Sequence, residues 1–227
     1  MFLPAFASMF WSSKWRLKTD WVEKHYLKAY KFYTSKKYDS CIPELDKVLE
    51  HPNANKDLEL LKAECYSNLG NSDMAYRIYK KYFESIDISI LSASDYWAPK
   101  ASAIELLVNK KDFDLALVIA QSLPEEKFNG FDFSLWKNHM KGMCFLGKDQ
   151  YEVALECFKT AVGRKRSMNY PYIDCHYFIS FIYAKLGKKG LAKKKFQRVY
   201  AADPTYKNVS DFMDAIESDS RLNISLL

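Results

Sequence analysis

The side chains best suited to metal or nucleophilic chemistry are histidines and cysteines, and their spacing in this chain does not assemble a site. The histidines are His25, His51, His139 and His176. No two of them lie four residues apart, the spacing that lets one helix present two ligands to a metal ion. Cys175 and His176 are adjacent, so on a helix they point in different directions. No nucleophile-elbow or glycine-rich phosphate motif occurs. We therefore predict that the chain is not an enzyme and uses no cofactor or metal.

The cysteines indicate a reducing environment. Their number is odd, no CxxC pair occurs, and each lies within an apolar pattern typical of a helix. No apolar run approaches the ~20 residues of a membrane-spanning helix. We expect buried free thiols and a cytoplasmic or other reducing intracellular location. The five cysteines are Cys41, Cys65, Cys144, Cys157 and Cys175.

The charge of the chain is unevenly distributed, so a charged surface is the next candidate for a functional site. The formal net charge is +6, yet residues 163–198 contain ten Lys or Arg and only one acidic residue, Asp174. Such a concentration attracts phosphates or acidic partners. A solvated outer helix face is the simpler explanation. The basic patch comprises Arg164, Lys165, Arg166, Lys188, Lys189, Lys193, Lys194, Lys195 and Arg198.

The elements that position these side chains are predicted to be helices. Gly and Pro number seven each, too few for a fold with many tight turns. Five segments share a small residue followed, four and seven residues later, by positions on the same helical face. The triplets are Cys41, Leu45 and Val48; Ala75, Tyr79 and Tyr82; Ala116, Ala120 and Leu123; Ala154, Phe158 and Ala161; and Ala192, Phe196 and Val199.

A second set of positions, twelve residues earlier, predicts a partner helix for each segment. Four of these five residues are small, and a bulky residue follows each of the five after three positions. The unit is therefore an antiparallel helix pair with a close contact in each helix. The earlier positions are Ala29 and Phe32, Ala63 and Tyr66, Ile104 and Leu107, Gly142 and Phe145, and Ser180 and Tyr183.

The repeated pair resembles the tetratricopeptide repeat family over roughly residues 22–205. The last copy carries the closest match, with Tyr183, Gly187, Ala192, Phe196 and Asp203-Pro204 at motif positions. The resemblance implies an all-α, right-handed solenoid of about five antiparallel helix pairs. We place this domain at residues 21–222 and expect a C-terminal capping helix through Ala215-Ile216. The apolar segment 1–20 is expected to pack on or near the first pair.

In a stack of this kind the first helix of each pair lines the concave side. Residues one turn either side of its packing position then face a groove, which suits a peptide or helix of another protein. We predict a scaffold or adaptor within a multiprotein complex, with nucleic-acid or anionic-surface binding through the basic patch as the alternative. The alternative to a binding role is that the aromatic rings predicted to line the groove only pack against neighbouring helices. The predicted partner contacts are Tyr26, Tyr30, Tyr33, Leu60, Glu64, Trp136, His139, Met143, Tyr177 and Phe181, and Asn68, Ala101, Glu105, Asn109 and Lys185 share their face.

Overall fold

The computed structural model describes residues 20–87, 97–123, 127–128 and 131–217. Their contacts gather into two compact units, Met1–Leu123 and Pro124–Leu227, called here the N-terminal and C-terminal units. One domain over residues 21–222 therefore stays a prediction. The expected packing of segment 1–20 falls, apart from Asp20, outside the described residues.

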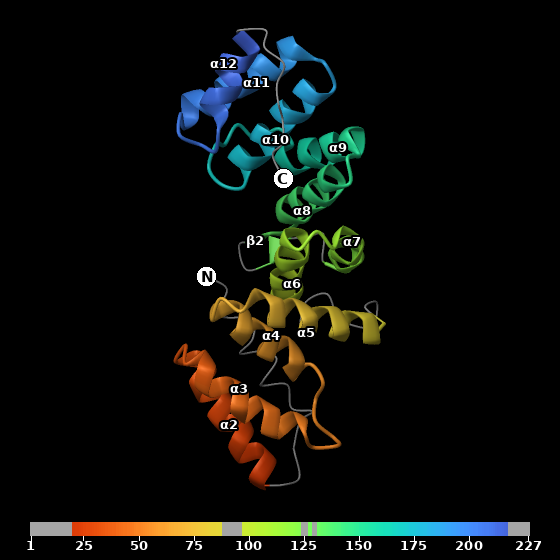
Figure 1. The fold of residues 1–227 in the computed structure, drawn as a ribbon, viewed down its shortest axis with the longest axis vertical. Coiled ribbons are helices and arrows are strands. Elements are labelled where there is room, and N and C mark those ends of the chain that lie inside the picture. Colours follow the sequence, from red (N-terminus) through yellow and green to blue (C-terminus); the bar gives the residue numbers. More distant parts are fainter. Residues whose placement is uncertain (1–19, 88–96, 124–126, 129–130, 218–227) are drawn as a thin grey trace. The chain divides into compact units, whose positions relative to one another are not determined.

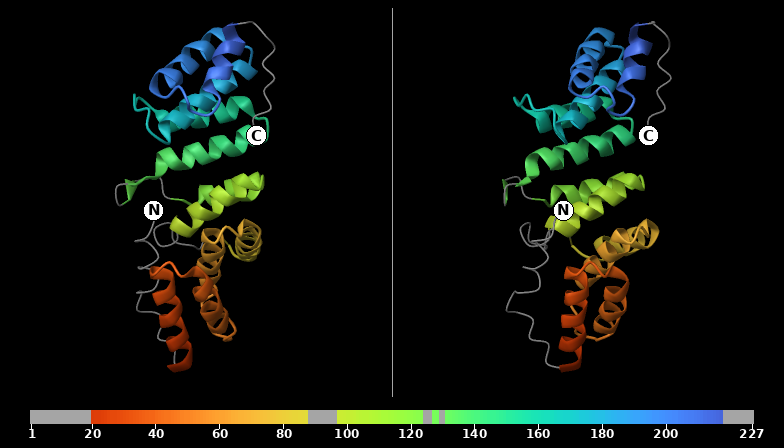
Figure 2. Two further views of the ribbon diagram at one scale, coloured as in Figure 1. Left: turned by 60° about the vertical axis from the view of Figure 1, so that its left-hand side comes forward. Right: turned by 90° about the vertical axis from the view of Figure 1, so that its left-hand side faces the viewer.

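Each unit consists of antiparallel helix pairs (Figures 1 and 2). The N-terminal unit contains the pairs α2 (Asp20–Thr34) and α3 (Tyr38–Leu49), α4 (Leu58–Asn68) and α5 (Ser72–Ser85), and α6 (Trp97–Asn109) and α7 (Phe113–Gln121). The C-terminal unit contains α8 (Phe133–Gly147) and α9 (Tyr151–Val162), then α10 (Tyr172–Lys185) and α11 (Lys189–Ala202), and finally α12 (Val209–Glu217). Before α8 lies a short antiparallel hairpin of β1 (Lys127–Phe128) and β2 (Phe131–Asp132).

The turn inside each pair has the same geometry in all five copies. Three residues separate the two helices, and the middle one has a left-handed backbone conformation. The amide before the second helix donates to a carbonyl five residues earlier, which satisfies an otherwise unpaired helix end. The middle residues are Lys36, Gly70, Lys111, Asp149 and Gly187. The accepting carbonyls belong to Phe32, Tyr66, Leu107, Phe145 and Tyr183, the five bulky positions of the sequence pattern.

The close contacts predicted between paired helices lie in the core. All ten positions identified as contacts are buried, including Ile104, the one large residue among them. The larger residues that follow on the second helices are buried too, for example Tyr79, Phe158 and Phe196. The predicted repeat frame is therefore confirmed at these positions.

Gly142 in α8 provides a direct test of this packing. A Cβ at this position would lie 2.7 Å from the ring of Phe158 in α9, closer than side chains tolerate. Overpacking costs about 2 kcal/mol, while Ala gains about 1 kcal/mol over Gly within a helix. We expect Gly142→Ala to lower the free energy of unfolding by about 1 kcal/mol net, measured by urea denaturation. Increased stability in Gly142→Ala would contradict the close α8–α9 contact.

The predicted capping helix is present as α12. It packs on α11, and the ring of Phe212 stacks on Phe196 with centroids 5.0 Å apart. Val209 is buried beside them, whereas Asp211 and Asp214 are exposed. The apolar face of α12 therefore covers the end of the last helix pair, and its acidic face is exposed to solvent, as terminal repeats require.

Candidate functional site

In the N-terminal unit the predicted groove residues divide between core and surface. Tyr33 and Leu60 are buried, so their predicted role as exposed partner contacts is wrong in this conformation. Tyr26 and Tyr30, one turn apart on α2, are partly exposed, and Glu64 on α4 is also partly exposed. These three keep accessible surface for a partner.

In the C-terminal unit most of the residues predicted to line the groove are buried in the core. Four of the predicted contacts are at most 5% exposed: Trp136, His139, Tyr177 and Phe181. The prediction that these side chains are exposed to a partner is therefore corrected. Met143 alone of the five predicted contacts in this unit is partly exposed. The four buried side chains serve packing, because a fully buried ring offers a partner no surface.

The side chain of Glu64 is half-buried between α2, α4 and α5, and its Oε2 atom is buried. Tyr33 forms a hydrogen bond with its carboxylate, yet the Oε2 atom has no partner within the described structure. The hydroxyl of Tyr79, which is fully buried, also has none there. Burial raises the pKa of Glu64 to about 7, although the hydrogen bond from Tyr33 acts in the opposite direction. The carboxyl group therefore titrates near neutral pH.

The second polar cluster surrounds Asp174 at the junction of α8, α10 and the turn before α12. His139 Nε2 lies 2.7 Å from one carboxylate oxygen, while the hydroxyl of Tyr206 donates to the other at 2.7 Å. Lys207 Nζ approaches that second oxygen at 2.5 Å and lies over the ring of Phe178, 4.1 Å from its centroid. Burial alone would raise the pKa of Asp174, but these partners outweigh it and lower the pKa to about 2.

The Asp174 cluster fastens the α12 turn to α8 and α10. Both carboxylate oxygens have partners, so Asp174 is held as a charged anchor. Tyr206 and Lys207 were not among the residues predicted from the sequence. A signal was available, because a lone Asp inside the apolar stretch of residues 172–182 needs buried partners.

The basic patch lies on α11 and on the α9–α10 connection. Arg164, Lys165 and Arg166 are exposed, as are Lys188, Lys189 and Lys194. Lys193, Lys195 and Arg198 are partly exposed. These positions suit contact with an anion, although exposure fits a solvated face as well.

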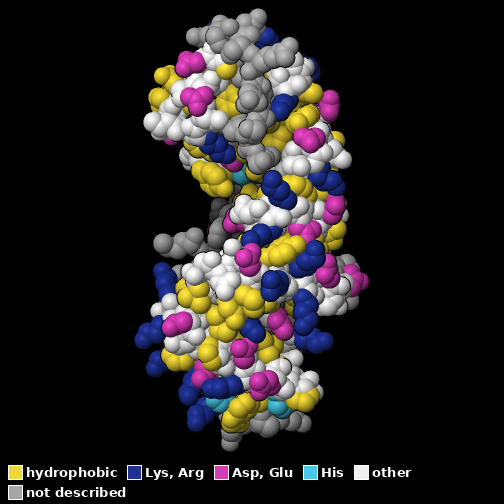
Figure 3. Space-filling model, viewed as in Figure 1, with side chains coloured by type: hydrophobic (Ala, Val, Ile, Leu, Met, Phe, Trp, Pro, Cys, Tyr) yellow, Lys and Arg dark blue, Asp and Glu magenta, His cyan; other side chains and the backbone are white. Residues whose placement is uncertain are grey.

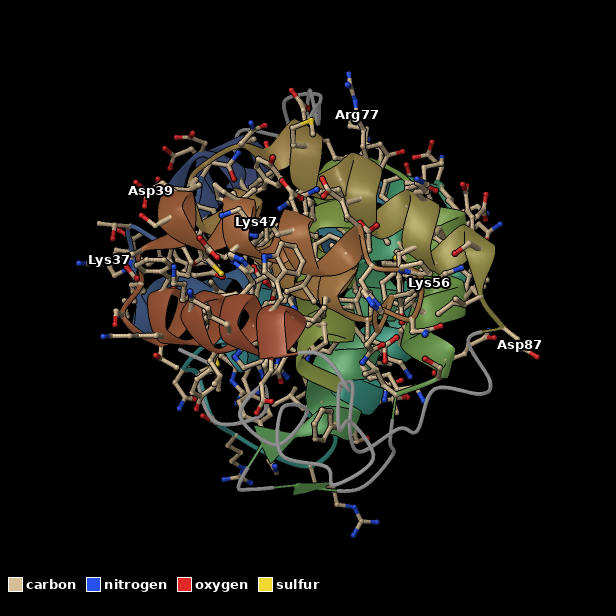
Figure 4. The ribbon with its side chains drawn as sticks, turned by 90° about the horizontal axis from the view of Figure 1, so that it is seen from below. Lys37, Asp39, Lys47, Lys56, Arg77 and Asp87 are labelled. Atoms are coloured by element: carbon tan, nitrogen blue, oxygen red, sulfur yellow. The ribbon has the colours of Figure 1, made fainter. Side chains whose placement is uncertain are left out.

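Elsewhere the surface carries a mixture of basic, acidic and apolar side chains. On the face in Figure 3, Lys and Arg side chains over the N-terminal unit alternate with acidic and apolar ones. Figure 4 shows Lys37, Asp39 and Arg77 pointing away from the helices. Exposed charges of both signs are typical of a solvated surface.

The described residues contain neither a cluster of metal-ligand side chains nor a helix able to span a membrane. Within the described ranges, no three His, Cys, Asp or Glu side chains are grouped as metal ligands require. Within the same ranges, none of the helices has the length and apolar character needed to span a bilayer. All five cysteines are free thiols, and four of them are buried.

Comparison with known proteins gives one curated relative and many similar structures. The relative is the BBSome complex member BBS4 of Bos taurus, 29% identical over 122 residues. The match covers 52% of this chain and 22% of the relative, so the chain spans about a fifth of that protein's length. No protein-family model matches the chain.

The solved structures agree on one architecture. MamA of Desulfovibrio magneticus, from residue 41 to its end, matches with a TM-score of 0.61 and 14% identity, over 83% of this chain and 98% of that one. The C-terminal part of a TPR repeat-containing protein of Cytophaga hutchinsonii matches with a TM-score of 0.60 and 15% identity, over 85% of this chain and 71% of that one. Together with the five similar turns and the buried repeat positions, these matches show a tetratricopeptide-like, predominantly helical fold, with five antiparallel pairs and a capping helix among the described residues.

Proposed function

We propose that the chain is a protein-interaction scaffold that binds a peptide or helix of a partner along the first helices of its pairs. The observation that carries this proposal is the pair Tyr26 and Tyr30 on α2. Both are large and partly exposed, and they flank the buried stripe of α2 that contains Ala29 and Tyr33. Tyrosines of this kind give a partner apolar contact area together with a polar tip.

In this proposal the neighbouring first helices contribute polar groups to the binding surface. Asn68 on α4 and Glu105 and Asn109 on α6 are exposed, and Glu64 is partly exposed. A surface with two tyrosines, carboxylates and amides suits an amphipathic segment that carries basic or amide side chains. The likeness to a BBSome complex member supports membership of a multiprotein assembly as part of this proposal.

Site-specific photo-crosslinking tests the proposed surface. A photoreactive phenylalanine at position 26 or 30 is expected to capture a partner, which mass spectrometry then identifies. The matched control is position 118 on α7, where Val118 is 50% exposed on a second helix. Capture at position 118 with none at 26 or 30 would contradict the proposal.

Substitution then gives the affinity of these contacts. We expect Tyr26→Ala with Tyr30→Ala to weaken binding of the captured segment about tenfold or more, because interface tyrosines contribute 1 kcal/mol or more each. Val118→Ala should leave the dissociation constant unchanged. Both constants can be measured by calorimetry with the synthetic segment. Equal affinity in the double variant would rule out this face.

The second candidate function is binding of nucleic acid or an anionic surface through the basic patch. The observation that favours it is the density of exposed cations on α11 and the α9–α10 connection. Phosphate-backbone binding weakens steeply with salt, whereas contacts through tyrosine rings do not. Affinity measured across a salt series therefore separates the two functions.

A further inference from the structure

Cationic groups on α9 and α11 lie close to one another beside α10. Lys195 and Arg198 lie one turn apart on α11, and the Arg198 guanidinium donates to the carbonyl of Arg166 at 3.0 Å. That hydrogen bond holds the α9–α10 connection against α11. Lys159 on α9 is close enough to act electrostatically on Lys195.

The cluster lacks a matching negative charge. Within the described structure no carboxylate lies within 4.0 Å of Lys195 or Arg198, and Lys159 alone has an acidic partner, Glu156 at 2.8 Å. Partial burial, followed by repulsion from Arg198, Lys194 and Lys159, lowers the pKa of Lys195. Like charges assembled from separate elements without a counterion destabilise the site when it is empty.

A buried histidine lies beside these cations. His176 on α10 is 2% exposed, and neither ring nitrogen has a hydrogen-bond partner in the part of the chain that the structure describes. Burial, with added repulsion from Arg198 and Lys195, lowers its pKa to about 4, so the ring is neutral at pH 7. A buried ring with two unpaired nitrogens is costly, because each nitrogen has lost its hydrogen bonds to water.

We propose that Lys195 and Arg198, with His176 beside them, form a binding site for a phosphate group carried by a phosphorylated segment of a partner protein. The Lys195 ammonium and the Arg198 guanidinium lie one turn apart on α11, which suits one compact anion. A phosphomonoester carries nearly two negative charges and three acceptor oxygens, and it matches an ammonium with a guanidinium better than one carboxylate does. The identity of the carrier as a protein rests on the proposed scaffold function, whereas the phosphate site does not.

The test uses the full chain, with inorganic phosphate and a phosphoserine peptide as probes and the unphosphorylated peptide beside them. We expect saturable shifts of the His176 ring signals in NMR spectra with phosphate and with the phosphopeptide, and none with the unphosphorylated peptide. Lys195→Gln with Arg198→Gln should weaken phosphate binding at least about tenfold, because charge-assisted hydrogen bonds contribute about 1.5–3 kcal/mol.

The matched control removes the same charge elsewhere. Lys28→Gln with Lys31→Gln changes two exposed lysines on α2 and should leave phosphate affinity unchanged. Equal weakening in both double variants, or shifts that never saturate, would overturn the site, because they indicate general charge attraction. Tight binding of single-stranded DNA without phosphate binding would overturn it as well. Tyr26→Ala with Tyr30→Ala should bind phosphate normally, so failure of the proposed partner face remains distinguishable.

Discussion

Replacing Asp174 with Asn is expected to lower the free energy of unfolding by about 3 kcal/mol. The carboxylate is 6% exposed and balances Lys207 while accepting a hydrogen bond from Tyr206. Removing one partner of a buried ion pair leaves the other charge without compensation. We take the low end of the usual range because the Lys207 side chain is 38% exposed and regains water.

The wild-type protein should show the same contribution as a pH dependence. The pKa of Asp174 in the folded state is about 2, below its value of about 3.9 in an unfolded chain. Stability from this group is therefore fully present above pH ~4 and is lost as the pH falls toward 2. Urea denaturation at several pH values measures both effects. Asp211→Asn on the exposed face of α12 is the control, and an equal effect of both substitutions would contradict the anchoring role.

Replacing Glu64 with Gln is expected to raise stability by about 2 kcal/mol at pH 8. The folded-state pKa of about 7 exceeds the unfolded value of about 4.3, so ionisation of Glu64 opposes folding. That difference corresponds to about 4 kcal/mol, which the partial exposure of the side chain reduces. Gln keeps an acceptor for Tyr33 and carries no charge.

The sign of the Glu64 effect gives a sharp control. A group with a raised pKa contributes most stability below its unfolded pKa and loses it as the pH rises through the folded value. The gain in Glu64→Gln should therefore vanish near pH 4. Glu59→Gln, one turn earlier on α4, should change stability by less than about 0.5 kcal/mol at either pH. A loss of stability in Glu64→Gln at pH 8 would contradict the conclusion that ionisation of Glu64 opposes folding.

The helix pairs were predictable because their close contacts recur at fixed spacing. Ala154 and Phe158, for example, occupy the positions in α9 that the pattern assigned to the core. The turn geometry was less visible. A left-handed conformation can be predicted at Gly70 and Gly187, because glycine adopts it readily. Lys36, Lys111 and Asp149 adopt the same conformation although they are not glycines. Only the repeated frame identifies those three.

The candidate site was harder to predict, for two physical reasons. Helical periodicity gives the direction of Trp136 or Tyr177 around its own helix, but not how closely the next helix covers it. Both proved to be core residues. The Asp174 cluster depends on Lys207, which reaches back from a turn 33 residues later, and local spacing carries no information about such a contact.

Hydrogen exchange of the full chain, alone and with the crosslinked partner's binding segment, tests the scaffold proposal most directly. Backbone amides of a docked helix exchange more slowly, so the measurement locates the contact surface in solution. We predict slower exchange in α2 and α4 of the N-terminal unit, centred on the turns that carry Tyr26, Tyr30 and Glu64, with α3 and α5 unchanged. Protection confined to α3 and α5, or none in this unit, would contradict binding along the first helices.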